Sequence, residues 1–214
     1  MTRRPLSRDR VIETAITMAD QSGLDGLSMR SLARELGVEA MSLYHWFHNK
    51  NELLEGMMGA VFAEMGRPAN TDAWRDDMRR AAIDAKDVLI RHKWAAKLLG
   101  EPIRPSRAQF EWMDGILARL RSAGFSRNMT HHAYHALDSH IVGFVLWLLP
   151  VLEMGNVMPD YADEVLAQLR DGSLPAFIEH VEEHLENQLG DENISEFEFG
   201  LDLLLDGLER LRGV

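Results

Sequence analysis

Hydrophobic positions recur at intervals of three and four residues along almost the whole chain, which is the spacing of one face of an α-helix. Runs of Val, Ile and Thr that alternate with polar residues, as strands do, are almost missing. The pattern therefore predicts an all-α protein. The helices that it predicts span residues 7–22, 28–36, 40–47, 49–65, 71–92, 106–123, 127–149, 174–189 and 194–212.

Polar and glycine residues mark where these helices begin and end. Ser28 is a predicted N-cap, and Gly37 is a predicted stop. Asn49 is followed three residues later by Glu52, which is a capping-box pattern. The segment 154–172 shows no clear period and is predicted to be a connector.

Helix length divides the chain in two. Three short helices occupy residues 1–50, whereas residues 51–214 contain longer ones, and the helix over 49–65 must link the two parts. We therefore expect two domains, with bounds 1–50 and 51–214.

The two helices on either side of "ELGV" form a helix-turn-helix candidate, because the second helix has one apolar face to bury. Leu43 and Phe47 lie four residues apart and are expected to dock on Leu32, Leu36 and Val38. The opposite face is small, aromatic and nearly uncharged, which suits contact with base edges in a major groove. This face carries Ala40, Met41, Tyr44, His45 and His48.

Flanking bases and the charge distribution agree with an anionic partner. Arg30, Arg34 and Lys50, with Ser28, are placed to reach phosphates on either side of the groove. The formal net charge of the chain is -11, but residues 1–50 hold seven Arg and Lys against six Asp and Glu. Residues 151–214 hold three against sixteen, so the acidity lies far from the helix-turn-helix. A scaffold of three helices that binds no nucleic acid fits the spacing too.

The stretch "GLSMRSLARELGVEAMSLYHWFHNKNELLEGM" resembles the DNA-binding domain of the tetracycline-repressor (TetR) family. The resemblance implies a DNA operator as partner and places an arginine on guanine at Arg30 and a phosphate contact at Lys50. The tetracycline repressor has glutamine and proline where this chain has Ala40 and Met41, so we expect a different operator. The DNA contacts that the resemblance implies are Ser28, Arg30, Ala40, Met41, Ser42, Tyr44, His45, Trp46 and Lys50.

The stretches "EPIRPSRAQFEWMDGILARLRSAGFS", "HALDSHIVGFVL" and "FEFGLDLLLDGLERL" are similar to the ligand-binding domain of the tetracycline-repressor branch. This similarity implies a homodimer through a four-helix bundle and a pocket for a small-molecule effector. The wide leucine stripe of the last helix independently indicates deep burial or a partner. The predicted effector contacts are His92, Phe110, Met113, Leu117, Leu137, His140, Ile141 and Phe144. The predicted dimer contacts are Trp147, Leu201, Leu204, Leu205 and Leu208.

The implied pocket departs from that of the tetracycline repressor. His92 matches a drug-contacting histidine, but the asparagine and phenylalanine of that site correspond to Gly115 and Arg119. The histidine that binds magnesium corresponds to Val142. We therefore expect an apolar or aromatic effector in place of magnesium–tetracycline, and we predict no cofactor.

Two alternatives belong to other functional classes. One is an operator-binding regulator that responds to no small molecule. The other is a metal-dependent hydrolase, because "HVEEH" places His180 and His184 around Glu183 in the order of inverted zinc proteases. A solvated, acidic helix face explains the same residues, and we predict no enzyme activity.

The remaining features agree with a cytoplasmic protein. There is no cysteine, and no apolar run follows the basic residues at the N-terminus, as it would in a secretory signal. The longest apolar run, Ile141–Leu152, contains a proline and is too short to cross a bilayer. The sequence thus predicts a cytoplasmic, ligand-responsive regulator without a membrane partner, and the family resemblance favours a repressor.

Overall fold

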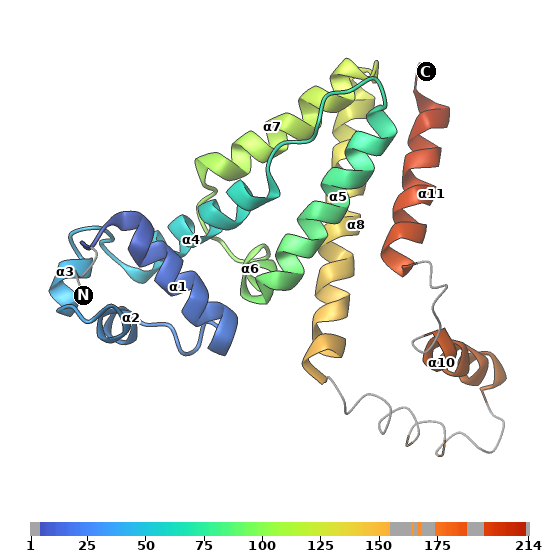
Figure 1. Cartoon of the computed structure of the whole chain (residues 1–214). Helices are drawn as coiled ribbons and strands as arrows, with labels where there is room; N and C mark the ends of the chain where they lie inside the picture. Colours follow the sequence, from blue (N-terminus) through green and yellow to red (C-terminus); the bar gives the residue numbers. More distant parts are fainter. Residues whose placement is uncertain (1–4, 155–163, 165–166, 168–173, 188–194, 213–214) are drawn as a thin grey trace.

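The computed structural model describes residues 5–154, 164, 167, 174–187 and 195–212. All regular elements among them are helices, which confirms the all-α prediction. Three short helices lie at one end of an elongated molecule, α4 leads away from them, and the longer helices form a bundle (Figure 1). The helices are α1 (Arg8–Ser22), α2 (Met29–Leu36), α3 (Ala40–Leu43), α4 (Lys50–Met65), α5 (Trp74–Arg91), α6 (Lys93–Leu98), α7 (Arg107–Ser122), α8 (Arg127–Met154), α10 (Pro175–Asn187) and α11 (Glu196–Leu211).

Local capping sets the N-terminal helices. Ser7 caps α1 by accepting a hydrogen bond from the Arg10 amide, and Ser28 and Ser31 form a reciprocal capping box at α2. Gly37 ends α2 with a positive φ of 66°, which a side chain would disfavour. These caps fix the sharp turn that carries the chain from α2 into α3.

The prediction of a helix over 40–47 is wrong in its second half. The α-helical hydrogen-bond pattern ends at Leu43, and the next residues form a turn in which the Trp46 and Phe47 amides both donate to the Leu43 carbonyl. Tyr44, His45 and Trp46 are weak helix formers, and the extended backbone of Asn49, at φ -157°, must start α4 directly afterwards.

Helix α4 connects the two parts of the chain. It packs against α1 near its beginning and against α5 and α7 further along, and its buried residues cover a broad half of the helix. A buried face this wide is typical of a helix that packs against several elements at once. The division into domains at residue 50 stays a prediction, because α4 shares its surface with both parts.

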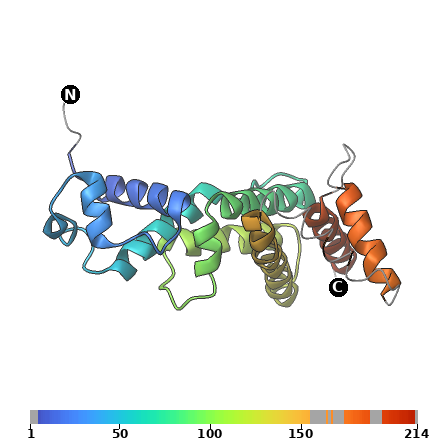
Figure 2. The ribbon, with the colours of Figure 1, turned by 90° about the horizontal axis from the view of Figure 1, so that it is seen from below.

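The bundle is built on α8, which packs against α5, α7 and α11. Seen from below, α11 and the three short helices lie at opposite ends of the molecule (Figure 2). The predicted end of α8 at Leu149 is wrong, because the helix continues through Pro150 to Met154. Proline removes one backbone hydrogen bond but does not always end a helix.

Residues 127–153 within α8 are long and apolar enough to cross a membrane by length and composition, and their most apolar window of 18 residues has a mean hydropathy of 1.5. Of the described helices, only this one meets that test. The core helix of a soluble protein meets the same criterion. Helix α8 packs against α5, α7 and α11, and 22% of its most apolar window is buried within this chain.

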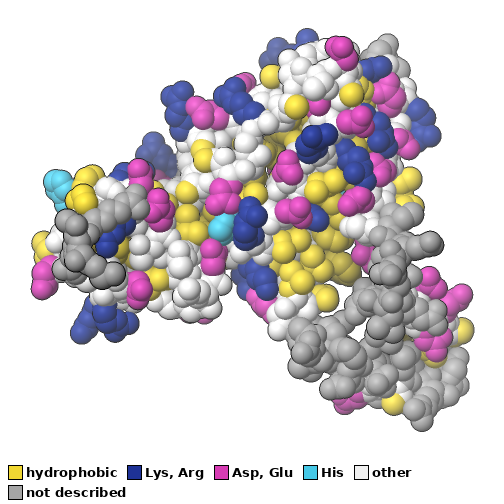
Figure 3. Space-filling view, in the orientation of Figure 1, with side chains coloured by type: hydrophobic (Ala, Val, Ile, Leu, Met, Phe, Trp, Pro, Cys, Tyr) yellow, Lys and Arg dark blue, Asp and Glu magenta, His cyan; other side chains and the backbone are white. Residues whose placement is uncertain are grey.

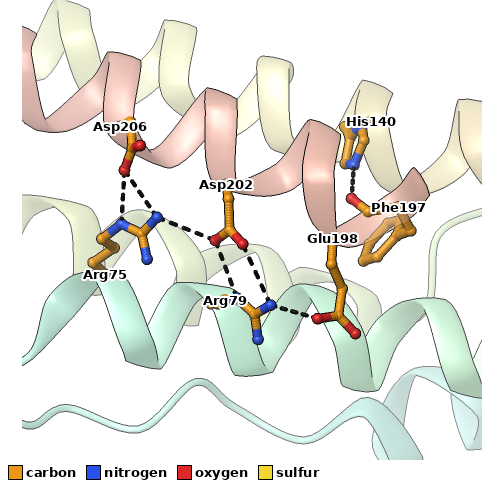
Figure 4. Close-up of polar contacts among 7 residues, drawn as sticks. All are labelled: Arg75, Arg79, His140, Phe197, Glu198, Asp202 and Asp206. Atoms are coloured by element: carbon orange, nitrogen blue, oxygen red, sulfur yellow. Dashed lines mark hydrogen bonds and ion pairs between the residues drawn. The ribbon is translucent and has the colours of Figure 1, made fainter. Parts of the chain in front are cut away.

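Charged side chains hold α11 along α5. Arg75 donates hydrogen bonds to Asp202 and Asp206, and Arg79 donates to Asp202 and Glu198 (Figure 4). Three carboxylates of the described C-terminal third, Glu198, Asp202 and Asp206, therefore face arginines of the same chain.

Candidate nucleic-acid interface and ligand cavity

The first candidate site is the surface formed by Ala40–Trp46, which we call the α3 surface. Leu43 and Phe47 are fully buried against the core that includes Leu32 and Leu36, as the spacing predicts. On the other side, Met41 is 77% exposed, the largest exposed fraction of any large hydrophobic side chain described, and Tyr44 is 43% exposed. An apolar side chain so exposed on a well-packed unit indicates a contact surface.

The other predicted DNA contacts lie on the same end of the molecule. Ser42 and His45 are exposed, whereas Ala40 and Trp46 are half-buried and pack partly against the core. Hydrophobic and histidine side chains are visible over this end in the space-filling view (Figure 3). The structure therefore brings the predicted recognition residues to one surface, although the α-helix beneath them is shorter than expected.

Basic residues flank the α3 surface without carboxylate partners. Arg30, Arg34 and Lys50 are exposed, and none of them forms an ion pair with any residue that the structure describes. The Lys50 ammonium donates only to the backbone carbonyl of Leu24, at 3.3 Å. Ser28 is exposed as well, but its hydroxyl already takes part in the capping box of α2. The three cations are thus available to an anionic partner.

A carboxylate close to this surface is engaged within the chain. Glu52 accepts hydrogen bonds from the His48 amide at 2.7 Å and from the His48 ring at 2.8 Å. The bond from the His48 backbone is the main cause that lowers the pKa of Glu52 below its usual value. The predicted capping box is therefore half correct: Asn49 caps the Glu52 amide, but the Glu52 side chain reaches His48 and leaves the Asn49 amide aside.

The second candidate site is a cavity of about 310 Å³ between α4, α5, α7 and α8, which we call the bundle cavity. Its size lies within the range of small-molecule sites, and its walls are mostly apolar. The lining residues are Phe62, Met65, Ala85, Leu89, Leu99, Gln109, Trp112, Met113, Tyr134, His135, Asp138, Ile141 and Val142.

Three predicted effector contacts lie at this site. Met113 and Ile141 line the bundle cavity, and Leu137 lines a small adjoining hollow that shares the wall of Trp112 and Tyr134. The sequence could have offered α4 as a source of lining residues, since its large apolar positions cover a broad half of the helix.

The other five predicted effector contacts do not line the bundle cavity. Phe110 is 57% exposed, and Leu117 is half-buried against the core. The His140 ring Nε2 donates a hydrogen bond to the Phe197 carbonyl oxygen at 2.9 Å, and the His140 ring stacks on the Phe197 ring (Figure 4). Phe144 packs on the same Phe197 ring. These two residues therefore join α8 to α11.

His92 lies elsewhere, at the junction between the short helices and the bundle. Its Nδ1 is 2.8 Å from an oxygen of Asp20 in α1, and its Nε2 is 3.3 Å from an oxygen of Glu64 in α4. Trp94 donates to the same Asp20 oxygen at 2.7 Å. His92 is buried, so its two ring nitrogens connect the first helix to the linking helix across the interior. An open hollow of about 690 Å³, lined by residues of both charges, lies beside this junction.

One acidic group distinguishes the bundle cavity. Asp138 lies in its wall on α8, beside Tyr134 and His135. Burial raises the pKa of Asp138, and the nearby His135 partly opposes that shift. Burial, with a smaller effect of the Asp138 charge, raises the pKa of Tyr134 to about 12. A carboxylate inside an otherwise apolar face of α8 is the signal by which this residue could have been found in the sequence.

The predicted dimer contacts divide into two groups. Leu201 and Leu205 are fully buried and Leu208 is nearly so, because they pack inside this chain, and the prediction that they contact a partner is therefore wrong. Trp147 is 55% exposed, and Leu204 is half-buried. Sequence reasoning missed the exposed apolar side chains of α8 and α11 that can meet a partner. They are Leu146, Phe199, Leu203 and Leu211.

No described group of three or more His, Asp and Glu side chains could hold a metal ion. Of the residues behind the hydrolase alternative, His180 and Glu183 are exposed on α10, and the side chain of His184 lies outside the described residues.

Two family patterns match the chain. Residues 11–57 match the family described as bacterial regulatory proteins, tetR family. Residues 67–212 match the family described as tetracyclin repressor-like, C-terminal domain.

Individual proteins agree with these matches. A transcriptional regulator with a helix-turn-helix from Saccharopolyspora erythraea is 33% identical over 67% of this chain and 61% of its own length. The transcriptional repressor DrrR1 of Streptomyces coeruleorubidus is 28% identical over 96% of this chain and 78% of its own length. The crystal structure of the TetR family protein ActR of Streptomyces coelicolor with (S)-DNPA is 25% identical, covers 98% of this chain and 100% of that one, and has a TM-score of 0.74.

Proposed function

The chain belongs to the TetR family of bacterial regulatory proteins and is a ligand-responsive, DNA-binding regulator, and we propose from this premise that it is a repressor with a palindromic operator. It binds this operator as a homodimer, and an apolar or aromatic effector in the bundle cavity releases it. The relatives include a protein named as a repressor, which supports this direction of control.

The observation that carries the proposal is the pairing of an exposed, uncharged face with unpaired cations. Met41 and Tyr44 project from the α3 surface, and Arg34 and Lys50 flank it without carboxylate partners among the described residues. Apolar and hydroxyl groups contact thymine methyls and base edges in the major groove, and flanking bases contact phosphates. Ala40 and Met41 supply no bidentate amide, so the operator differs from that of the tetracycline repressor.

The dimer is supported by uncovered apolar area. Only 22% of the most apolar window of α8 is buried within one chain, and Trp147, Phe199 and Leu203 are exposed by more than half. Pairing these faces of α8 and α11 with those of a second copy removes them from water. Two α3 surfaces held about one DNA turn apart then contact the two halves of a palindrome.

The effector acts through the walls of the bundle cavity. Phe62 and Met65 of α4 line it, and Glu64 between them contacts His92, which contacts Asp20 of α1. A molecule that shifts the end of α4 therefore moves the short helices and changes the spacing of the two α3 surfaces. A coupling of about 1–3 kcal/mol changes operator affinity roughly 5- to 150-fold.

The matched family and its relatives are transcriptional regulators, and we propose that this chain likewise has no catalytic activity and works in the cytoplasm, where its DNA lies. The domain division at residue 50 assigns the DNA contacts to the first part and the effector and dimer contacts to the second.

Selection of operators from randomised duplexes tests the DNA part of the proposal. We expect selection of a palindromic sequence that is distinct from the tetracycline operator. Binding of this sequence should protect the backbone amides of α3 from hydrogen–deuterium exchange. Selection of no sequence, or of the tetracycline operator, contradicts the proposal.

Compounds from a thermal-shift screen then test release, because a ligand that binds only the folded state raises its melting temperature. An effector should lower operator affinity of the wild type. The effector should not lower the operator affinity of Val142→Trp, because the tryptophan fills the bundle cavity. It should still lower the operator affinity of Val142→Ile. Equal release of both variants contradicts the assignment of the effector to this cavity.

A further inference from the structure

Asp138 is the one acidic residue in the walls of the bundle cavity. It lies on the same face of α8 as Tyr134 and Ile141, and all three also line the small adjoining hollow. The facing walls come from α4, α5 and α7 and are formed mainly by Phe62, Leu89 and Trp112. A carboxylate in these surroundings has exchanged much of its water for hydrocarbon, which disfavours the charged form unless a partner compensates.

The described chain gives Asp138 no such partner. Neither lysine nor arginine lines the cavity, and no described side chain donates a hydrogen bond to the Asp138 carboxylate. The other titratable groups at the cavity are Tyr134, which is buried and neutral, and His135, which is exposed at its edge. The desolvation that raises the pKa of Asp138 exceeds the opposing effect of His135.

We propose that Asp138 selects the effector by charge, and that the effector is an apolar or aromatic molecule that carries a protonated amine. This inference rests on the proposed function, since it specifies the class of molecule that the bundle cavity takes. The apolar body fills the space between Phe62, Leu89 and Trp112, and the ammonium group donates to the Asp138 carboxylate. A charge-assisted hydrogen bond of this kind is stronger than one between neutral groups.

The same geometry disfavours other ligand classes. A carboxylate-bearing molecule of the same shape would bring a second negative charge beside Asp138 with no lysine or arginine in the walls to offset it. A neutral alcohol fills the cavity equally well but leaves the Asp138 charge without a counter-charge. The expected order of affinity is therefore amine, then alcohol, then acid.

Three probes that share a naphthalene ring test this order: 1-naphthylmethylamine, 1-naphthylmethanol and 1-naphthoic acid. Each is titrated into the full chain at neutral pH by isothermal calorimetry. In the wild type we expect the amine to bind most tightly. In Asp138→Asn the amine should bind roughly 10- to 100-fold more weakly, and the alcohol should change less than about twofold.

Two further variants keep the test specific. Asp114→Asn removes an exposed carboxylate on α7 outside the cavity and should leave all three affinities unchanged. His135→Gln removes the only other cationic candidate at the cavity and should retain the preference for the amine. Circular dichroism and thermal melting establish that each variant folds.

The outcomes separate the two proposals. The charge inference is overturned if the amine binds Asp138→Asn as tightly as it binds the wild type. If the alcohol also binds both proteins alike, the assignment of the effector to the cavity is unaffected. Tighter binding of the acid than of the amine by the wild type also overturns the charge inference. Binding of none of the three probes contradicts the cavity as an effector site, and the charge inference falls with it.

Discussion

The α3 surface and the bundle cavity treat charge in opposite ways. At the α3 surface, Arg34 and Lys50 are exposed, have no carboxylate partner among the described residues, and surround an uncharged face. In the bundle cavity, a single carboxylate, Asp138, is set among apolar walls. The α3 surface offers positive charge to a large anion at a site exposed to water. The bundle cavity offers negative charge to a small molecule at a site that is shielded from water.

The difference teaches how a chain of net charge -11 can bind DNA. Several of its carboxylates are engaged within the chain: Glu52 accepts from His48, and Asp202 and Asp206 accept from arginines of α5. Electrostatic interactions between exposed groups are screened by salt within about 10 Å, whereas contacts in a desolvated cavity are screened far less. The two sites should therefore respond differently to the same perturbation.

The largest expected contrast is in salt dependence. With about four phosphate contacts per dimer, from Arg34 and Lys50 of each protomer, operator affinity should fall roughly 150-fold between 50 and 200 mM salt. Binding of 1-naphthylmethanol to the bundle cavity should change less than twofold, since the ligand is neutral. Fluorescence anisotropy measures the first and calorimetry the second. An operator affinity that is flat over this range would break the comparison.

A charge placed on the α3 surface comes next. Met41→Glu puts a carboxylate at the most exposed apolar position and should weaken operator binding about 100-fold, because like charges across an interface cost several kcal/mol. Met41→Leu is the matched control. Neither variant should change the melting temperature or probe binding, since Met41 is largely exposed and does not line the bundle cavity. Unchanged operator affinity of Met41→Glu would remove α3 from the interface.

The connection between the sites is tested at His92. His92→Ala removes the group that contacts both Asp20 and Glu64, and should reduce the effector-induced loss of operator affinity by about 10-fold. Probe affinity should persist, because His92 does not line the bundle cavity. Arg80→Ala, an exposed change on the same helix, serves as control. If the effector releases His92→Ala from the operator as fully as it releases the wild type, the contacts of His92 do not couple the bundle cavity to the α3 surface.

The smallest effect concerns stability. Burial raises the pKa of Asp138 in the folded chain above its value in the unfolded chain. Between these two pKa values the unfolded chain binds fewer protons than the folded chain, so the free energy of unfolding decreases as pH rises through this window. Asn does not titrate, and Asp138→Asn should melt about 2 °C higher at neutral pH. The difference in melting temperature between the variant and the wild type should shrink as pH falls below the usual pKa range of aspartate. A variant that melts lower than the wild type at neutral pH contradicts an uncompensated charge.

The α3 surface could be predicted because its residues are close in sequence. Leu43 and Phe47 turn inward by helical spacing, which leaves Met41 and Tyr44 outside without any knowledge of the rest of the fold. The bundle cavity could not be predicted in the same way, since its walls come from four helices between Phe62 and Val142. Spacing within one helix does not tell which apolar face meets a cavity and which meets another helix.

The errors have the same origin. Leu201 and Leu205 share a stripe that fits a partner or the chain's own core, and only the packing of α11 on α5 and α8 decides for the core. The prediction that His92 contacts the effector stays a prediction, but its contacts with Asp20 and Glu64, which are distant in sequence, could not be foreseen. Pairings of this kind depend on tertiary structure, which no local pattern contains.

A molecule in the bundle cavity is expected above all to change the spacing of the two α3 surfaces. The chain has no cysteine, so Gln21→Cys, an exposed position at the end of α1, accepts one spin label per protomer. Pulsed electron paramagnetic resonance then measures the distance between the two labels in the free, operator-bound and effector-bound dimer. We predict one distance distribution with operator and a shifted one with effector, while Gln21→Cys/Val142→Trp shows no shift. An unchanged distance at effector concentrations that release the operator would contradict the claim.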